Sequence, residues 1–357
     1  MIPYIIMLTI PILLHPFTKH TMVNHVKIDR LPMTLFFLIL TVLVALRHPR
    51  VGNDTINYIH YFDQIARSGW NQIRWNNLEP GYQLFNKLLS LISGNSRFFL
   101  AAVALAVSVM LFLPYHRLCE DAPLSIVLFC NLSTFMMMFS GIRQMMAIGV
   151  GMIAYAFVLR KRPILFLLSV LVAMGFHTSA FMLLPMYPLY YTRITKKGAF
   201  FSLPVLVLAF VFNRQIFSVL GRLLQSYTKY EATQMVTGAY SMLALFALFA
   251  VFCFVIPDES ILDEETIGLR NFLLFSLLIQ MFAPLNMLAM RMNYYYIIFI
   301  PLLLPRIISC TRVRYRGVAV LARTIMLVFF FAYFFVRANS AITMHTVPYH
   351  FFWEHYS

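Results

Sequence analysis

The residues best suited to chemistry in this chain are a few polar side chains beside long apolar stretches. Asp54 lies in the sequence Gly-Asn-Asp-Thr, and Glu79 opens the sequence Glu-Pro-Gly-Tyr. Either carboxylate near a membrane-bound substrate could accept a proton from a hydroxyl group. The alternative interpretation is that both are ordinary loop acids or helix caps. These two residues are therefore candidates for a general base.

Two arginines stand apart from the other basic residues. Arg143 lies in Ser-Gly-Ile-Arg-Gln between two apolar runs, and Arg291 lies in Met-Arg-Met-Asn before three tyrosines. A charge at the margin of a membrane is costly, which suggests a function. The planar guanidinium group also matches a phosphate or pyrophosphate in a bidentate manner. The alternative is that each arginine simply extends toward the headgroups from a helix end.

One histidine and several further polar residues complete the set of candidates. His177 follows Gly-Phe in a tight turn between two apolar runs, where it could hold or relay a proton near neutral pH. A hydrogen-bonded structural histidine is the alternative. The sequence contains no Gly-rich phosphate loop, no metal-spaced cluster and no serine elbow, so no metal or other cofactor is expected. The secondary candidates are Tyr58, Tyr82, Gln144, Arg214, Arg222 and Tyr349.

The composition indicates that these residues are positioned by membrane helices. Hydrophobic residues make up 61% of the 357, charged residues 11%, and the mean hydropathy is +0.77. A soluble domain carries roughly a quarter charged residues. Runs of about 17 to 25 apolar residues recur along the chain, each long enough to cross a bilayer. Stretches that are apolar on every face exclude the alternating pattern of a barrel, so helices are expected.

The basic net charge of +15 does not indicate nucleic acid as a partner. The lysines and arginines are spread over short loops, and no loop combines a basic stripe with stacking aromatics. Anionic lipid headgroups are the better default. The four cysteines follow no CxxC spacing, so neither a disulfide framework nor a metal site is expected.

We predict an all-α integral membrane protein with about 12 transmembrane helices in a single polytopic domain over residues 1–357. Most of the basic loop residues fall in alternate connections, and the remaining short connections hold only Arg143 and Arg291. Positively charged loops stay cytoplasmic, so both termini are expected outside. The predicted spans are 2–17, 31–46, 98–115, 123–139, 144–159, 163–175, 177–191, 199–213, 239–256, 271–289, 293–309 and 318–336.

Two longer connections, 47–97 and 214–238, are predicted to be external loops. Apolar residues at helical spacing predict amphipathic helices in both, lying in the outer membrane interface, and Pro80 can open one of them. The acidic segment 258–265 is interpreted as a solvated loop. No internal repeat is evident, so the duplicated halves common in transporters are not supported.

The candidate residues, taken in order, resemble the EpsG family, which belongs to the Wzy-type bacterial polysaccharide polymerases. The likeness runs from about residue 50 to the C-terminus, and each motif is weak when taken alone. Asn53 departs from the small residue or threonine expected before the aspartate, and it leaves the carboxylate in place. The matching motifs are Gly52-x-Asp54 with Tyr58, Glu79-Pro80-Gly81-Tyr82, Arg143-Gln144, His177-x-Ser179, Arg291 near tyrosines, and Pro348-Tyr349.

The resemblance implies an inverting glycosyltransferase with a GT-C-like helical fold in the bacterial cytoplasmic (inner) membrane. Such an enzyme joins oligosaccharide repeat units carried on undecaprenyl pyrophosphate, at the outer face and without a nucleotide sugar. The implied partners are this lipid-linked oligosaccharide, the lipid bilayer, a chain-length regulator and a flippase. No nucleic acid is implied.

This chemistry suggests a role for each primary candidate. A leaving pyrophosphate gains negative charge, which Arg143 and Arg291 could stabilise. The attacking hydroxyl needs a base, for which Asp54 is favoured and Glu79 and His177 are rivals. A flippase for lipid-linked oligosaccharides is the main alternative function. A membrane acyltransferase that uses His177, or a scaffold without activity, are the others.

Overall fold

The computed structural model of the chain describes residues 1–18, 21–23, 26–73, 78–132, 134–223, 238–338 and 344–355. The regular structure in these ranges is helical apart from a short antiparallel pair of strands, β1 (Thr21–Val23) and β2 (Val26–Ile28). The expectation of an all-α chain is therefore confirmed in its main feature. Contacts divide the chain into unit 1, Met1–Leu184 with Ala322–Ser357, and unit 2, Pro185–Leu321.

Unit 1 carries most of the predicted site residues. Asn95 caps the start of α5 by accepting a hydrogen bond from the backbone N–H of Arg97. Pro80 and Pro163 are the first residues of α4 and α9. The backbone N–H that proline lacks would have no partner within the helix at this position, so proline costs no hydrogen bond there. The helices of this unit are α1 (Ile2–Leu14), η1 (His15–Phe17), α2 (Arg30–Ala45), α3 (Thr55–Arg67), η2 (Trp70–Gln72), α4 (Pro80–Ile92), α5 (Ser96–Leu118), α6 (Ala122–Asn131), α7 (Thr134–Ser140), α8 (Ile142–Leu159), α9 (Pro163–Phe176), η3 (Thr178–Leu183) and most of α17 (Arg316–Ala338).

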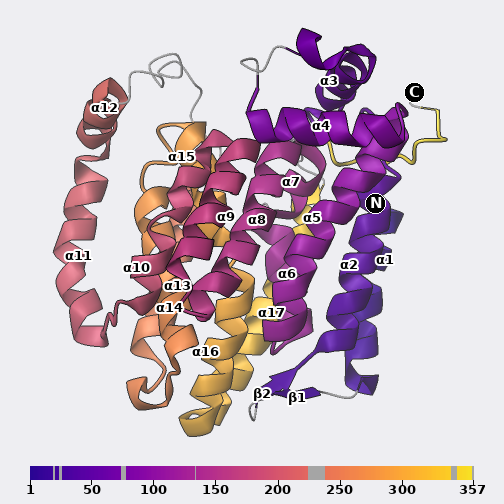
Figure 1. The fold of residues 1–357 in the computed structure, drawn as a ribbon. Helices are drawn as coiled ribbons and strands as arrows, with labels where there is room; N and C mark the ends of the chain where they lie inside the picture. Colours follow the sequence, from indigo (N-terminus) through magenta and orange to yellow (C-terminus); the bar gives the residue numbers. More distant parts are fainter. Residues whose placement is uncertain are drawn as a thin grey trace. The chain divides into compact units, whose positions relative to one another are not determined.

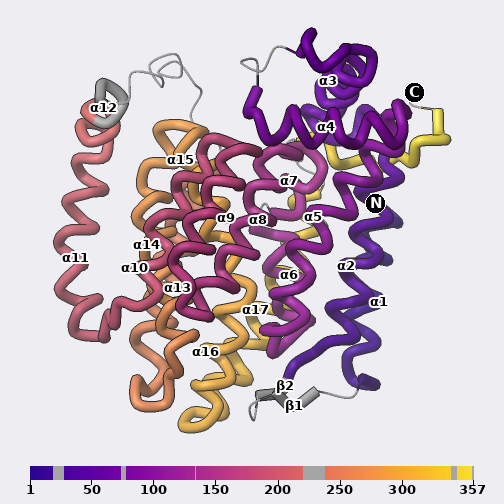
Figure 2. Tube along the Cα trace, in the orientation of Figure 1, coloured from indigo at the N-terminus to yellow at the C-terminus, as the bar shows by residue number. Residues whose placement is uncertain are grey.

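Helices α3 and α4 occupy the two stretches of the 47–97 connection that were predicted to be helical. Within unit 1, α4 lies across the ends of the longer helices and contacts α3, α5 and α9 (Figure 1). The tube drawing follows the same course from α2 through α3 and α4 into α5 (Figure 2). Leu88 and Ile92 of the predicted apolar stripe are exposed, by 48% and 73%. This exposure suits a helix lying in a membrane interface.

Residues 344–355, called here the C-terminal segment, pack against the loop between α2 and α3. The backbone N–H of His48 donates to the carbonyl oxygen of His350 (2.8 Å), and that of Gly52 donates to His345 (2.9 Å). These bonds hold the α2–α3 loop, which carries Asp54, against a segment almost three hundred residues away in sequence.

Unit 2 contains α10 (Met186–Tyr191), α11 (Lys196–Val211), α12 (Asn213–Leu223), α13 (Ala239–Val255), η5 (Glu259–Ile261), α14 (Glu264–Gln280), α15 (Met287–Ile297), α16 (Ile300–Arg314) and the start of α17. The second predicted amphipathic stretch therefore begins as α12, whereas residues 224–237 lie outside the described residues.

The acidic segment 258–265 is partly exposed, as expected of a solvated loop, but two of its carboxylates also have a structural role. Arg270 and Arg306 are almost fully buried, and this acidic segment supplies their partners. Arg270 lies 3.4 Å from the carboxylate of Glu259, and Arg306 lies 3.0 Å from that of Glu265. A buried guanidinium needs such a counter-charge, so the segment holds the structure of unit 2 together.

The apolar helices are those of a membrane-embedded protein. Within the described residues, α5, α8 and α17 are long and apolar enough to cross a membrane. Three bent pairs raise the number to six if each is one span: α6 with α7 (56°), α11 with α12 (73°) and α15 with α16 (48°). Four shorter apolar helices, α1 with η1, α2, α9 and α13, add to this set. Twelve spans, a GT-C-like arrangement and a single domain stay predictions.

Several predicted spans differ from the observed helices. The spans 123–139 and 293–309 each run over one of these bends, and two others are broken or shifted. Residues 177–191 were expected to form one helix, but they form the 3-10 helix η3 followed by the short α10. Pro185 and Pro188 lie in this stretch, and proline lacks the N–H that a continuous helix requires. The predicted span 271–289 also fails, because α14 starts earlier, at Glu264, and ends at Gln280 before a turn that leads to α15.

Candidate functional site

Glu79 and Arg143 form an ion pair within unit 1. One carboxylate oxygen of Glu79 accepts a short hydrogen bond from Nη1 of Arg143. Its other oxygen accepts from the backbone N–H of Thr178 at 3.2 Å and lies 3.4 Å from the Thr178 hydroxyl. Residues from the starts of α4, α8 and η3 therefore meet at one carboxylate. The sequence presented Glu79 and Arg143 as separate candidates and gave no sign of this pairing.

Gly81 explains how Glu79 comes so close to the turn after α9. A Cβ atom at Gly81 would meet the carbonyl oxygen of Gly175 at 2.7 Å and the carbonyl carbon at 2.8 Å. Only glycine lets the start of α4 approach the end of α9 this closely. Neither Glu79 nor Asp54 uses its side chain to cap the helix that follows. Both carboxylates are thus free of the helix-capping role proposed as the alternative.

His177 joins α9 to η3, and its ring faces its own chain. Nδ1 accepts a hydrogen bond from the backbone N–H of Ser179 (3.3 Å) and lies 2.7 Å from the Ser179 hydroxyl. A backbone N–H can only donate, so Nδ1 of the neutral ring is an acceptor and the proton resides on Nε2. The ring therefore presents a donor rather than a base to its surroundings.

Three tyrosines from α3 and α4 stand beside the ion pair. Arg143 hydrogen-bonds to the side chain of Tyr58. The buried ring of Tyr82 lies 6.1 Å from the rings of both Tyr58 and Tyr61, edge-on to the first and stacked with the second. Tyr61 was not among the sequence candidates. It follows Tyr58 by three residues, and residues at that spacing share one face of a helix.

The ion pair controls the charges in this cluster. Burial acts to raise the pKa of Glu79, but Arg143, the backbone N–H groups and His177 outweigh it and hold that pKa below its ordinary value. Burial raises the pKa of Tyr61 to about 12, and Arg143 partly opposes this rise. At neutral pH Glu79 is therefore a carboxylate and Tyr61 a neutral phenol.

Asp54 lies in a loop that is fixed against the end of α7. The backbone N–H of Asn53 donates to the Ser140 hydroxyl (3.1 Å), and the Thr55 hydroxyl donates to the carbonyl oxygen of Phe139 (3.1 Å). Ser140 ends α7 just before α8 begins with Arg143 as its second residue. The Asp54 loop is therefore anchored to residues that precede Arg143 in the chain by only a few positions.

Arg47 is a buried cation beneath this loop that sequence reasoning missed. Its side chain is 1% exposed; Nη1 donates to the carbonyl oxygen of Val44 and Nε to the Thr55 hydroxyl (3.4 Å). Burial lowers its pKa to about 10, while Tyr349, Tyr4 and Tyr58 oppose the change. No sequence signal distinguishes Arg47 from an orientation signal at a helix end.

The other sequence candidates lie at different places. Gln144 is buried in α8 next to Arg143, and Tyr349 is buried in the C-terminal segment, where its hydroxyl donates to the carbonyl oxygen of Leu43 (2.9 Å). Arg291 is exposed on α15 of unit 2, so its role in the clamp stays a prediction.

Two candidates lie on α12. Arg214 is exposed there, and the side chain of Arg222 lies outside the described residues. Within the part of the chain that the structure describes, no group of three or more His, Cys, Asp or Glu residues could hold a metal ion. The expectation that no cofactor is needed stays a prediction.

Comparison with known proteins identifies the family. No curated protein and no solved structure matches the chain. The model of the EpsG family matches residues 30–351, which is nearly the whole chain and includes Asp54, Glu79, Arg143 and His177. EpsG is a family of Wzy-type polysaccharide polymerases. The chain belongs to the EpsG family.

Proposed function

We propose that this protein joins oligosaccharide repeat units carried on undecaprenyl pyrophosphate, at the outer face of the bacterial cytoplasmic membrane. The observation that carries the proposal is the ion pair of Glu79 and Arg143, held against Thr178 by the second oxygen of the same carboxylate. Helix termini and turns far apart in sequence converge there on one charged cluster. Such a cluster can hold an arginine in a fixed orientation for an anionic substrate.

The proposed step is a single displacement at the anomeric carbon of the donor glycan. The oxygen of an acceptor hydroxyl forms the new C–O bond, and the bond between the anomeric carbon and pyrophosphate breaks. The hydroxyl proton goes to Asp54, and pyrophosphate leaves with the bonding electrons. This direct displacement inverts the anomeric configuration and needs one base.

Arg143 is the cation proposed for the departing pyrophosphate in unit 1, and the same role for Arg291 of unit 2 rests on the sequence alone. Glu79 positions Arg143 and leaves part of its side chain, 26% of it, exposed to a ligand. The Nε atom of Arg143 is buried and has no hydrogen-bond partner among the described residues. A preorganised guanidinium stabilises developing negative charge at the moment the bond breaks.

The hydrogen bonds that Glu79 and His177 already accept favour Asp54 as the base. Both oxygens of Glu79 already accept hydrogen bonds, and Nδ1 of His177 accepts one as well. Hydrogen bonds accepted by a group stabilise its unprotonated form and lower its tendency to take a further proton.

The test is reconstitution of the purified protein with a lipid-pyrophosphate repeat unit in proteoliposomes. Gel separation of the products should show a ladder of lengthening glycans, and the liberated lipid pyrophosphate should increase with it. Movement of the lipid across the bilayer without any ladder would overturn the proposal and support a flippase.

A further inference from the structure

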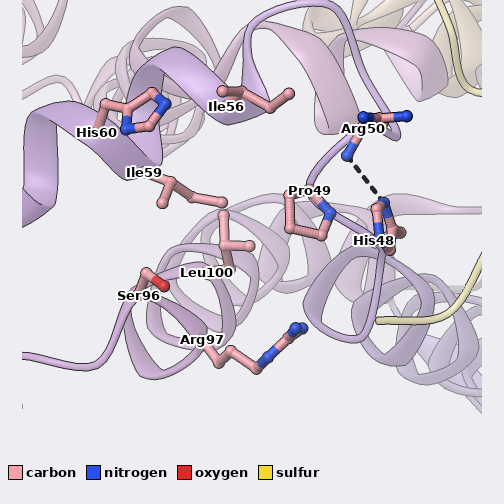
Figure 3. Close-up of a pocket in the computed structure, with 9 residues that line it drawn as sticks. All are labelled: His48, Pro49, Arg50, Ile56, Ile59, His60, Ser96, Arg97 and Leu100. Carbon is pink, nitrogen blue, oxygen red and sulfur yellow. Dashed lines mark hydrogen bonds between the residues drawn. The ribbon is translucent and has the colours of Figure 1, made fainter. Parts of the chain in front are cut away.

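Unit 1 contains a cavity of about 290 Å³ (Figure 3), and neither Glu79 nor Arg143 is among its lining residues. It is lined by the α2–α3 loop, one face of α3 and the start of α5, and none of its nine lining residues is acidic. The volume is close to the lower limit of roughly 300 Å³ for small-ligand sites. The lining residues are His48, Pro49, Arg50, Ile56, Ile59, His60, Ser96, Arg97 and Leu100.

The cavity combines cations at its ends with an apolar floor. His48 and Arg50 lie on one side of the cavity, His60 lies on the opposite side, and Arg97 lies below with its side chain directed toward His48. Ile59 and Leu100 lie between them (Figure 3). Arg97 is held in place from outside the cavity, because its guanidinium carbon lies 4.0 Å from the centroid of the Phe352 ring. Its Nη2 also donates to the Phe352 carbonyl oxygen (3.4 Å).

Helix α3 separates this cavity from the ion-pair cluster. At 3.6 residues per turn, Ile56, Ile59 and His60 project from one face of α3. Tyr58 and Tyr61, which accompany Arg143 and Tyr82, project from the opposite face. The two sites therefore share a helix but use different side chains.

We propose that this cavity binds the phosphate group of a lipid, with the apolar floor receiving the first carbons of the lipid chain. Arginine binds phosphate oxygens through paired N–H donors, and the lining of the cavity contains two arginines, Arg50 and Arg97. The volume admits a headgroup and a short length of chain but not a sugar repeat unit. The shared chemistry is a phosphate ester on an apolar chain, which a bilayer phospholipid or a polyprenyl phosphate both provide.

Binding of a phosphate should change the protonation of His48. Burial lowers the pKa of His48, and neighbouring cations lower it further, so a bound anion should draw a proton onto the ring. Binding should then strengthen as the pH falls from about 8 to about 6. The charged and titratable groups around the His48 ring are Arg50, Arg97, His350, Glu354 and, across the cavity, His60.

The test measures binding to the full-length protein in nanodiscs of neutral phosphatidylcholine. The probes are undecaprenyl phosphate, phosphatidylglycerol and inorganic phosphate, and retention is read by native mass spectrometry and by titration. Wild-type protein should retain a phosphate lipid about tenfold more strongly than Arg97→Gln. Arg117→Gln, a matched change at the other end of α5, should bind as the wild type does.

A second variant keeps the test informative if loss of Arg97 disturbs folding. Ile56 is 40% exposed, so Ile56→Glu places a negative charge in the cavity with little effect on the core. This variant should also lose the lipid while its thermal midpoint stays near that of the wild type.

The outcomes separate the sources and the alternatives. Selective retention of undecaprenyl phosphate identifies the carrier lipid, and equal retention of phosphatidylglycerol identifies a general phospholipid site; either result supports the proposal. Equal binding of inorganic phosphate would overturn the role of the apolar floor. Unchanged lipid retention in Arg97→Gln and Ile56→Glu, or an equal loss in Arg117→Gln, would overturn the site. None of these readouts depends on polymerisation, so failure here is distinct from failure of the proposed function.

Discussion

At the scale of single residues, the three candidate bases differ in what already occupies their acceptor atoms. Glu79 is engaged by Arg143 and Thr178, and His177 is engaged by Ser179. The side chain of Asp54 makes no cap to α3, although it stands at the position where an aspartate often caps a helix. Because the Asp54 carboxylate makes no hydrogen bond to the start of α3, it can accept a proton from a substrate hydroxyl.

Replacing Asp54 by asparagine tests this assignment. Asp54→Asn keeps the size and polarity of the side chain but removes the base, so glycan transfer should fall by at least about a hundredfold. Binding of the lipid-linked substrate should be unchanged, because the proposed clamp is intact. Single-turnover assays and equilibrium binding measure the two quantities. Full activity in Asp54→Asn would move the base to Glu79 or His177.

The Glu79–Arg143 pair should also stabilise the fold in a pH-dependent manner. The pKa of Glu79 is lowered, so its stabilising effect is present above the ordinary glutamate pKa and is lost as pH falls through the lowered pKa. At neutral pH, Glu79→Gln should destabilise the protein by about 1 to 3 kcal/mol. Unfolding of the wild type, both single variants and the double variant with Arg143→Ala measures the coupling. Additive effects in this cycle would contradict the pair.

At the scale of structural elements, the site depends on the approach of chain segments that are remote in sequence. The α2–α3 loop is held by the C-terminal segment on one side and by the end of α7 on the other. Gly52 makes this possible, because its φ is +92° and a Cβ atom there would meet the Phe139 carbonyl oxygen at 2.3 Å. A residue with a side chain must move the loop.

Gly52→Ala should therefore displace Asp54 and reduce transfer. The positive φ and the clash should together cost about 1 to 3 kcal/mol of stability. Thermal unfolding and ladder formation measure both effects. Gly94→Ala is the matched control, since Gly94 has no atom within 4 Å of an added Cβ and no positive φ is recorded for it. Equal behaviour of the two variants would show that the loop does not position Asp54.

At the scale of the whole molecule, the sequence determined the helical class, the family and the helices α3 and α4. Helices α3 and α4 could be predicted because apolar residues at helical spacing and a proline at the first helical position are local features of the sequence. The pairing of Glu79 with Arg143 joins residues 64 apart in sequence, and no local pattern encodes such a contact. The break at residues 177–191 was missed because apolar composition outweighed Pro185 and Pro188 in the prediction.

The basic residues show the same limit of sequence reasoning. Counting charges treated Arg270 and Arg306 as cytoplasmic loop residues, and Arg47 fell in a long connection that the count left out. The structure buries all three. Arg270 and Arg306 are neutralised by the segment 258–265, which was predicted to be solvated. Burial depends on packing between elements, and neither net charge nor hydropathy reports it.

The sidedness of the chain is a further prediction at this scale. Gly94, between α4 and α5, should face outward, and Arg162, before α9, should face the cytoplasm. In a Cys310→Ser background, a membrane-impermeant maleimide should label Gly94→Cys in intact cells. It should label Arg162→Cys only after the cells are permeabilised. The reverse pattern would place the Asp54 and Glu79 cluster on the cytoplasmic side and refute outer-face polymerisation.

The most direct test of the central claim is the rate of ladder formation by Arg143→Ala against Arg160→Ala. Arg143 is the second residue of α8 and carries the ion pair with Glu79, whereas Arg160 is the exposed residue that caps the opposite end of the helix. Loss of one preorganised contact to the departing pyrophosphate should slow polymerisation by Arg143→Ala about a hundredfold. Arg160→Ala should polymerise at the wild-type rate. A correctly inserted Arg143→Ala protein that forms ladders as fast as the wild type would contradict the account.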